Sequence, residues 1–203
     1  MTQQTDYEKI RRIITRGKYG SVYFAQSFRG FNAEYTSKLL AAFEKEGLLA
    51  RISKGVYLKA RHTRFGIAYP PIDDIVHEIA RRDKALVIPT GETAANLLGL
   101  SEQVPTHTSF LTTGTYRTLQ IGQRSVLLKN AAPRNFQYHN PLLGTLVQAL
   151  RSIGQSNVTE AHLQRIAQLL SGVTPDHQFH KDLLLAPVWI QNIITQTLKN
   201  SGK

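Results

Sequence analysis

The chain has 203 residues, 41% of them hydrophobic, and 25 lysines and arginines against 14 acidic residues give it a formal net charge of +11. It contains no cysteine, which excludes disulfides, thiolate zinc sites and cysteine nucleophiles. Because no apolar run approaches the roughly 20 residues of a membrane span and the N-terminus lacks a signal-peptide core, we expect a soluble, cytoplasmic protein.

The positive charge is concentrated at the front of the chain. Residues 1–69 hold 13 basic and five acidic residues, a net of +8, whereas residues 70–203 hold 12 and nine, a net of +3. Lysine and arginine neutralise phosphates and release condensed counterions, so a basic front favours a polyanionic partner, most often nucleic acid. A solvated basic surface without a partner is the alternative.

Three helices are predicted at the front. The periodicity of residues 4–16 predicts the first helix, and residues 23–28 predict a short second one. Asn32 is a suitable N-cap for a third helix, which Gly47 ends. The residues expected to face the core from the first and third helices are Tyr7, Ile10, Ile13, Ile14, Thr36, Leu39, Leu40 and Phe43.

A basic hairpin is predicted after the third helix, with β-type runs 48–52 and 56–58 around Ser53-Lys54-Gly55. Three helices followed by a hairpin are the layout of a winged helix-turn-helix, whose third helix enters the major groove and whose hairpin, the wing, lies along the backbone. An ordinary solvated helix face is the alternative for each residue taken singly. The residues predicted to contact DNA are Asn32, Glu34, Ser37, Lys38 and Ala41 of the helix and Arg51, Ser53, Lys54 and Tyr57 of the hairpin.

The second part of the chain is predicted to begin after residue 69, where Pro70-Pro71 stiffens the connection. We therefore expect a winged helix-turn-helix DNA-binding domain over residues 1–69 and an α+β domain over residues 70–203. Within the latter, a helix from residue 72, a strand at 86–88, a helix after Thr90 and three β-type runs precede a helical extension from Pro141 onward. The expected fold class is α+β.

No set of residues for catalysis stands out. His177 and His180 share a helical face beside Asp176 and Asp182, but no third ligand at a matching spacing completes a metal site. The glycine of Thr90-Gly91-Glu92 is a weak phosphate-binding signal without a recognised phosphate motif. We therefore expect no catalytic residues, no cofactor and no metal, and a protein that is not an enzyme.

Two segments of the second part, PTGETAANLLGLSEQVPTHTSFLTTG at residues 89–114 and RTLQIGQRSVLLKNA after it, resemble the middle domain of AbiEi antitoxins of type IV (AbiE-type) toxin-antitoxin systems. The stretch FEKEGLLARISKGVYLK at residues 43–59 resembles the end of that family's N-terminal winged helix. The resemblance runs from about residue 7 to residue 150, and its most specific part is the run from Ala94 to Ser101 with Gln103-Val104-Pro105 after it.

The resemblance implies a transcriptional autorepressor that binds inverted repeats in its operator, and an antitoxin that counteracts a nucleotidyltransferase-like toxin in abortive infection, with or without a stable complex. It supports DNA contacts only for the helix and hairpin residues already named, among which the acidic Glu34 departs from a uniformly basic helix. A stand-alone winged-helix regulator with a ligand- or protein-binding rear domain is the main alternative. An RNA-binding or nucleotide-handling enzyme is a third.

Overall fold

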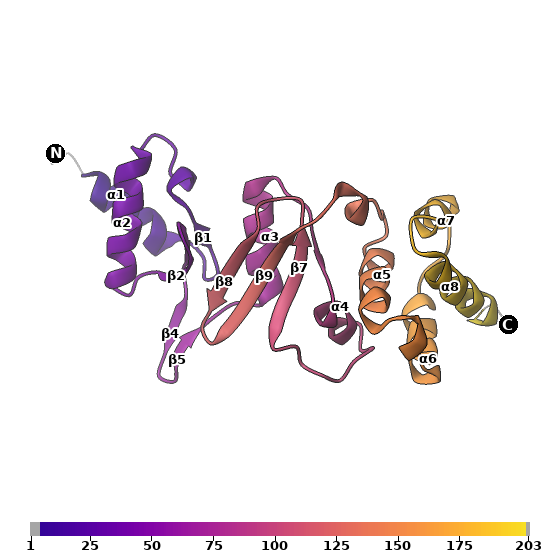
Figure 1. Ribbon diagram of the computed structural model, residues 1–203. Helices are drawn as coiled ribbons and strands as arrows, with labels where there is room; N and C mark the ends of the chain where they lie inside the picture. The colour runs from indigo at the N-terminus through magenta and orange to yellow at the C-terminus, as the bar shows by residue number, and fades with distance from the viewer. Residues whose placement is uncertain (1–4, 202–203) are drawn as a thin grey trace. The chain divides into compact units, whose positions relative to one another are not determined.

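The computed structural model describes residues 5–201 and has mixed α and β structure that ends in a helical segment (Figure 1). Its contacts divide the chain into two compact units. Unit 1 comprises residues 1–84 and 117–126, and unit 2 comprises residues 85–116 and 127–203. The expected α+β class with a helical C-terminal part is therefore confirmed.

Unit 1 begins with the first predicted helix, α1 (Asp6–Arg16). Thr5 and Glu8 form a capping box that satisfies free backbone N–H groups at its start. Ile10 and Ile14 are fully buried, whereas Ile13, expected on the same face, is 46% exposed. The helix thus buries a narrower stripe than its sequence predicts.

The short helix predicted over residues 23–28 is present only as a 3-10 helix, which is shorter than predicted and begins later. Val22–Tyr23 is instead a strand, β1, followed by a 3-10 turn, η1 (Ala25–Ser27). The Ser27 hydroxyl accepts a hydrogen bond from the Phe24 backbone N–H and fixes this turn. Strand pairing outweighs the local helical pattern, because Tyr23 lies opposite Tyr57 in an antiparallel ladder.

The third predicted helix is confirmed as α2 (Ala33–Lys45). Asn32 caps it by accepting a hydrogen bond from the Tyr35 backbone N–H at 2.9 Å. Gly47, with φ of 75°, follows its C-terminus. Its buried residues are those predicted, namely Thr36, Leu39, Leu40 and Phe43.

The predicted basic hairpin is present as β2 (Ala50–Ser53) and β3 (Val56–Leu58), joined through Lys54 and Gly55. Together with β1 these strands form an antiparallel sheet in the order β1-β3-β2, so β3 is the central strand. The aromatic and aliphatic core of unit 1 lies between this sheet and the two helices. Its buried members are Ile10, Ile14, Tyr23, Phe28, Leu39, Leu40, Phe43, Leu49 and Tyr57.

Unit 1 is larger than the domain predicted over residues 1–69, because it also includes residues 70–84 and 117–126. After a second hairpin, β4 (Arg61–Thr63) and β5 (Gly66–Ala68), the helix α3 (Ile72–Asp83) also belongs to it. The Arg82 guanidinium lies 3.6 Å from the centroid of the Phe24 ring, and Asp83 pairs with Arg117 at 3.6 Å. These contacts, and the packing of β8 (Arg117–Ile121) against β2, draw residues 70–84 and 117–126 into the unit.

The second sheet has four strands in the order β6-β7-β9-β8, and the unit boundary falls within β9. Its remaining strands are β6 (Val87–Pro89), β7 (His107–Thr112) and β9 (Arg124–Asn130). The helices of unit 2 are α4 (Glu92–Leu97), η2 (Pro133–Phe136), α5 (Pro141–Ile153), η3 (Gln155–Asn157), α6 (Glu160–Leu170), α7 (His177–Leu183) and α8 (Val188–Ser201).

The core of unit 2 is helical and centres on α5, where every residue from Leu143 to Leu150 is buried. Apolar residues of α4, α6, α7 and α8 complete the same cluster. None of the helices in residues 5–201 combines the length and apolar character that a membrane span requires.

Candidate nucleic-acid interface

The exposed face of α2 carries the predicted helix contacts. Glu34, Ser37 and Lys38 are exposed, and Ala41 is half-buried. Asn32 has a structural task as well, because its side-chain oxygen caps the helix. The face therefore offers one hydroxyl, one ammonium and one carboxylate to a partner.

Glu34 and Lys38 form an i,i+4 ion pair on this face, with Lys38 Nζ 2.8 Å from Glu34 Oε1. Both side chains are more than 70% exposed, so the pair contributes only about 0.3–0.5 kcal/mol to folding. Such a weak pair leaves Lys38 free to exchange Glu34 for a phosphate or a base edge. The carboxylate nevertheless lowers the positive potential of α2.

The β2–β3 hairpin presents two basic side chains. Lys54 is exposed at the turn beside Gly55, whose φ of 70° strongly favours glycine. Arg51 is also exposed, and its Nε lies 3.5 Å from the Ser53 carbonyl oxygen. Ser53 itself is half-buried.

Tyr57, the ninth residue predicted to contact DNA, does not lie on the surface. It is only 4% exposed and belongs to the core of unit 1, between Tyr23 of β1 and Arg51 of β2 in the sheet. Its neighbours Val56 and Leu58 are buried too, because the central strand is covered on both faces. Tyr57 is therefore a packing residue.

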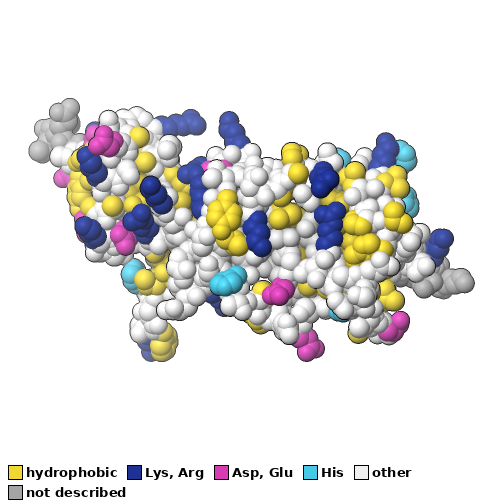
Figure 2. Space-filling model, viewed as in Figure 1, with side chains coloured by type: hydrophobic (Ala, Val, Ile, Leu, Met, Phe, Trp, Pro, Cys, Tyr) yellow, Lys and Arg dark blue, Asp and Glu magenta, His cyan; other side chains and the backbone are white. Residues whose placement is uncertain are grey.

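The basic character of unit 1 exceeds the prediction for residues 1–69. Unit 1 contains 18 lysines and arginines and nine acidic residues, so it holds +9 of the net charge of +11. Figure 2 shows dark blue side chains spread over this part of the molecule, with magenta ones interspersed among them.

Some of the basic residues of unit 1 are used within the fold. Lys59 donates to the carbonyl oxygens of Thr15 and Gly17 at 2.6 and 2.7 Å, which compensates the negative end of α1. Arg11 pairs with Glu46 at 2.8 Å. Other exposed basic side chains, Arg51 and Lys54 among them, form no ion pair within the described residues and remain available to a polyanion.

The sequence prediction missed a second basic element, the β4–β5 hairpin. Residues 61–67 lie within an exposed antiparallel ribbon, with Arg64 and Phe65 at its turn. The available signal was the absence of acidic residues from KARHTRFGIAYPP together with the Thr-Arg-Phe-Gly turn.

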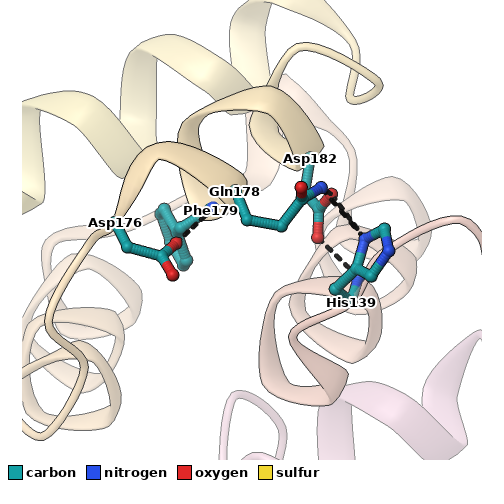
Figure 3. Close-up of polar contacts among 5 residues, drawn as sticks. All are labelled: His139, Asp176, Gln178, Phe179 and Asp182. Atoms are coloured by element: carbon teal, nitrogen blue, oxygen red, sulfur yellow. Dashed lines mark hydrogen bonds and ion pairs between the residues drawn. The ribbon is translucent and has the colours of Figure 1, made fainter.

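A polar cluster of unit 2 is built around a buried carboxylate (Figure 3). Asp182 of α7 is 2% exposed and accepts hydrogen bonds from the His139 backbone N–H, at 2.5 Å, and from Gln178 Nε2, at 2.8 Å. His139 Nδ1 lies 3.1 Å from Asp182 Oδ1, and the rest of that ring is largely exposed. Two shallow pockets of about 290 and 510 Å³ border His139.

The cluster is best explained as an anchor of α7 on the start of α5. Burial opposes ionisation of Asp182, but the hydrogen bonds from Gln178 and His139 and from the Asn140 backbone outweigh it, so the pKa of the carboxyl lies below its ordinary value. Asp176, shown in the same figure, caps α7 through the Phe179 backbone N–H. In the part of the chain that the structure describes, no three histidine or acidic residues are grouped to hold a metal ion.

Comparison with known proteins gives a family match. The sequence model described as a family of unknown function (DUF6088) matches residues 9–177, which include all of the predicted DNA-contacting residues. No curated protein matches the chain.

Proposed function

We propose that this chain, which belongs to the DUF6088 family of unknown function, binds double-stranded DNA through unit 1 and represses its own operon. Placing α2 in the major groove would bring Ser37 and Lys38 to the base edges. Arg51 and Lys54 of the β2–β3 hairpin would contact phosphates beside it.

The arrangement of unit 1 carries this proposal. An exposed helix is followed directly by a hairpin with a basic turn, and the hairpin is completed by a strand that precedes the helix, in the order β1-β3-β2. A winged helix combines its recognition helix and wing in this way. The net charge of +9 on the same unit favours the phosphate backbone as partner.

The antitoxin role rests on the resemblance of residues 89–114 to AbiEi antitoxins. By this resemblance, unit 2 would counteract a nucleotidyltransferase-like toxin encoded beside the chain, while unit 1 represses transcription. The stand-alone regulator remains the alternative, and a neighbouring nucleotidyltransferase-like reading frame is the observation that favours the antitoxin.

The DNA-binding proposal is tested with the duplex that precedes the chain's own reading frame, by fluorescence anisotropy over a range of salt concentrations. Replacing Arg51 and Lys54 with alanine removes two phosphate contacts, so the slope of log K against log salt should fall by about 2. The matched control, Lys129→Ala with Lys181→Ala, removes the same charge from exposed positions of unit 2 and should leave the slope unchanged. Equal slopes for the wild type and the Arg51/Lys54 variant would contradict the proposal.

The two roles are separated by co-expression with the neighbouring toxin from a foreign promoter. A Lys38→Ala, Arg51→Ala, Lys54→Ala variant should fail to repress a reporter behind the chain's own promoter and should still restore growth. Loss of both activities in this variant, when its fold is intact, would show that unit 1 carries the antitoxic surface as well.

A further inference from the structure

The β4–β5 hairpin has a fixed shape although it contributes nothing to the core. Its strands pair with Thr63 opposite Gly66, and the Thr63 hydroxyl donates to the Gly66 carbonyl oxygen at 2.8 Å and accepts from the Phe65 backbone N–H at 3.2 Å. A two-stranded ribbon alone is at best marginally stable in water. These bonds therefore hold a turn whose side chains point into solvent.

The turn presents an aromatic ring and a cation together. Phe65 is 86% exposed, and the Arg64 guanidinium carbon lies 4.7 Å from the centroid of its ring. Figure 2 shows yellow and dark blue spheres side by side at the tip of this hairpin. Aromatic side chains and arginine are the groups that stack on bases or enter base steps.

The surroundings of the tip are positive and partly apolar. Arg61, Arg64 and Arg124 are exposed and form no ion pair within residues 5–201. An open groove of about 800 Å³ adjoins the hairpin. Residues lining it include Phe65, Ile67, Tyr69, Pro70, Ile121 and Arg124. This combination of charge and aromatic surface is complementary to a nucleic acid.

The middle of strand β4 contacts the end of the helix proposed to read DNA. His62 Nε2 lies 2.7 Å from the carbonyl oxygen of Gly47, the residue that follows the C-terminus of α2. The turn with Arg64 and Phe65 follows one residue pair beyond this contact, so it lies close to the end of α2. A protein segment that flanks a helix in the major groove is well placed to reach the adjacent minor groove.

We propose that the β4–β5 hairpin is a second DNA-contacting element, in which Phe65 enters the minor groove as a wedge and Arg61, Arg64 and Arg124 contact the neighbouring phosphates. This inference rests on the proposed function, because it needs α2 in the major groove. Wedges of this kind unstack a base step and bend the duplex. The hairpin would thus add DNA bending to DNA binding.

The test uses the full chain and a 24-base-pair duplex, taken from the DNA that the chain protects from nuclease digestion upstream of its own reading frame. In one set of duplexes 2-aminopurine is placed at successive positions. In another, a donor and an acceptor dye are attached to the two ends. The wild type should raise 2-aminopurine fluorescence at one step and shorten the end-to-end distance. Phe65→Ala should abolish both effects and weaken binding roughly 5- to 150-fold, as expected for the loss of one stacked aromatic side chain, without changing the salt slope. Phe65→Leu should retain much of the bend, because leucine also acts as a wedge.

Tyr116→Ala is the matched control, since it removes another exposed aromatic ring, which is 60% exposed and belongs to unit 2. If Phe65→Ala bends and binds the duplex as the wild type does, the proposal that Phe65 acts as a wedge is overturned. The DNA-binding proposal stands in that case, provided that the Arg51/Lys54 variant still shows a reduced slope of log K against log salt. A larger loss on the single-stranded 24-mer than on the duplex would also overturn the wedge, in favour of a stacking site for single strands. Failure of the wild type to bind the duplex would overturn both proposals.

Discussion

Replacing Asp182 with alanine should destabilise unit 2 strongly. The carboxylate is 2% exposed and accepts hydrogen bonds from the His139 backbone N–H, from the His139 ring and from Gln178. Hydrogen bonds to a charged acceptor contribute about 1.5–3 kcal/mol each. The His139 ring is largely exposed and can turn to water, so the two remaining bonds, from the His139 backbone N–H and from Gln178, lead us to expect a net loss of about 3 kcal/mol.

Trp189 makes this loss measurable in unit 2 alone. It is the only tryptophan of the chain, and it packs against the core of unit 2 from α8. Urea unfolding followed by its fluorescence gives the free energy of unfolding of that unit. Asp176→Ala is the control, because it removes an exposed helix cap of α7 and should cost only about 1 kcal/mol.

The pH dependence of the free energy of unfolding provides an independent check on the role of Asp182. The pKa of Asp182 is lower in the folded state than in the unfolded state. Its stabilising contribution is therefore fully present above the unfolded pKa of about 3.9. That contribution is lost as the pH falls from this value through the lowered pKa of the folded state. The difference in the free energy of unfolding between the wild type and Asp182→Asn should therefore shrink on acidification below about pH 4.

The proposed role of Asp182 as an anchor of α7 would be refuted if Asp182→Ala unfolded within about 1 kcal/mol of the wild type at pH 7, well short of the expected loss.

Two further predictions concern unit 1. Glu34→Gln releases Lys38 and removes a negative charge from α2, so the affinity for duplex DNA, measured by anisotropy, should rise a few-fold. The free energy of unfolding should change by less than about 0.5 kcal/mol. An unchanged affinity would place α2 away from the DNA. Tyr57→Ala should destabilise unit 1 by about 3–5 kcal/mol, as large core truncations do, with loss of amide-exchange protection in β1 and β3. Tyr57→Phe should leave DNA affinity unchanged, and a specific loss of affinity in that variant would restore Tyr57 to the interface.

The helices α1 and α2 were predictable because their signals are local. Asn32 as a cap, the 3,4 spacing of Leu39, Leu40 and Phe43, and Gly47 after the C-terminus all lie within one short stretch. The turn at Gly55 was predictable for the same reason. These features account for the correct placement of the exposed face of α2.

The parts that were not predicted depend on residues far apart in sequence. The strand at Val22–Tyr23 exists because Tyr57 and Leu58 pair with it, and the local sequence around residues 22 and 23 does not reveal that partner. Tyr57 was predicted to contact DNA as a residue of the hairpin, whereas β3 is the central strand of its sheet and is buried on both faces. The contact of Asp182 with His139 spans 43 residues.

Unit 1 is discontinuous in sequence, and this affects the order in which the protein can be completed during synthesis. Residues 117–126, which supply β8 beside β2 and the Arg117 partner of Asp83, are translated after residues 85–116 of the other unit. At about 5–20 residues per second, the ribosome adds them roughly 2–8 s after Lys84. During that interval β2 lacks the strand that packs against it, so a nascent chain halted before residue 117 would leave this side of β2 exposed to chaperones and proteases.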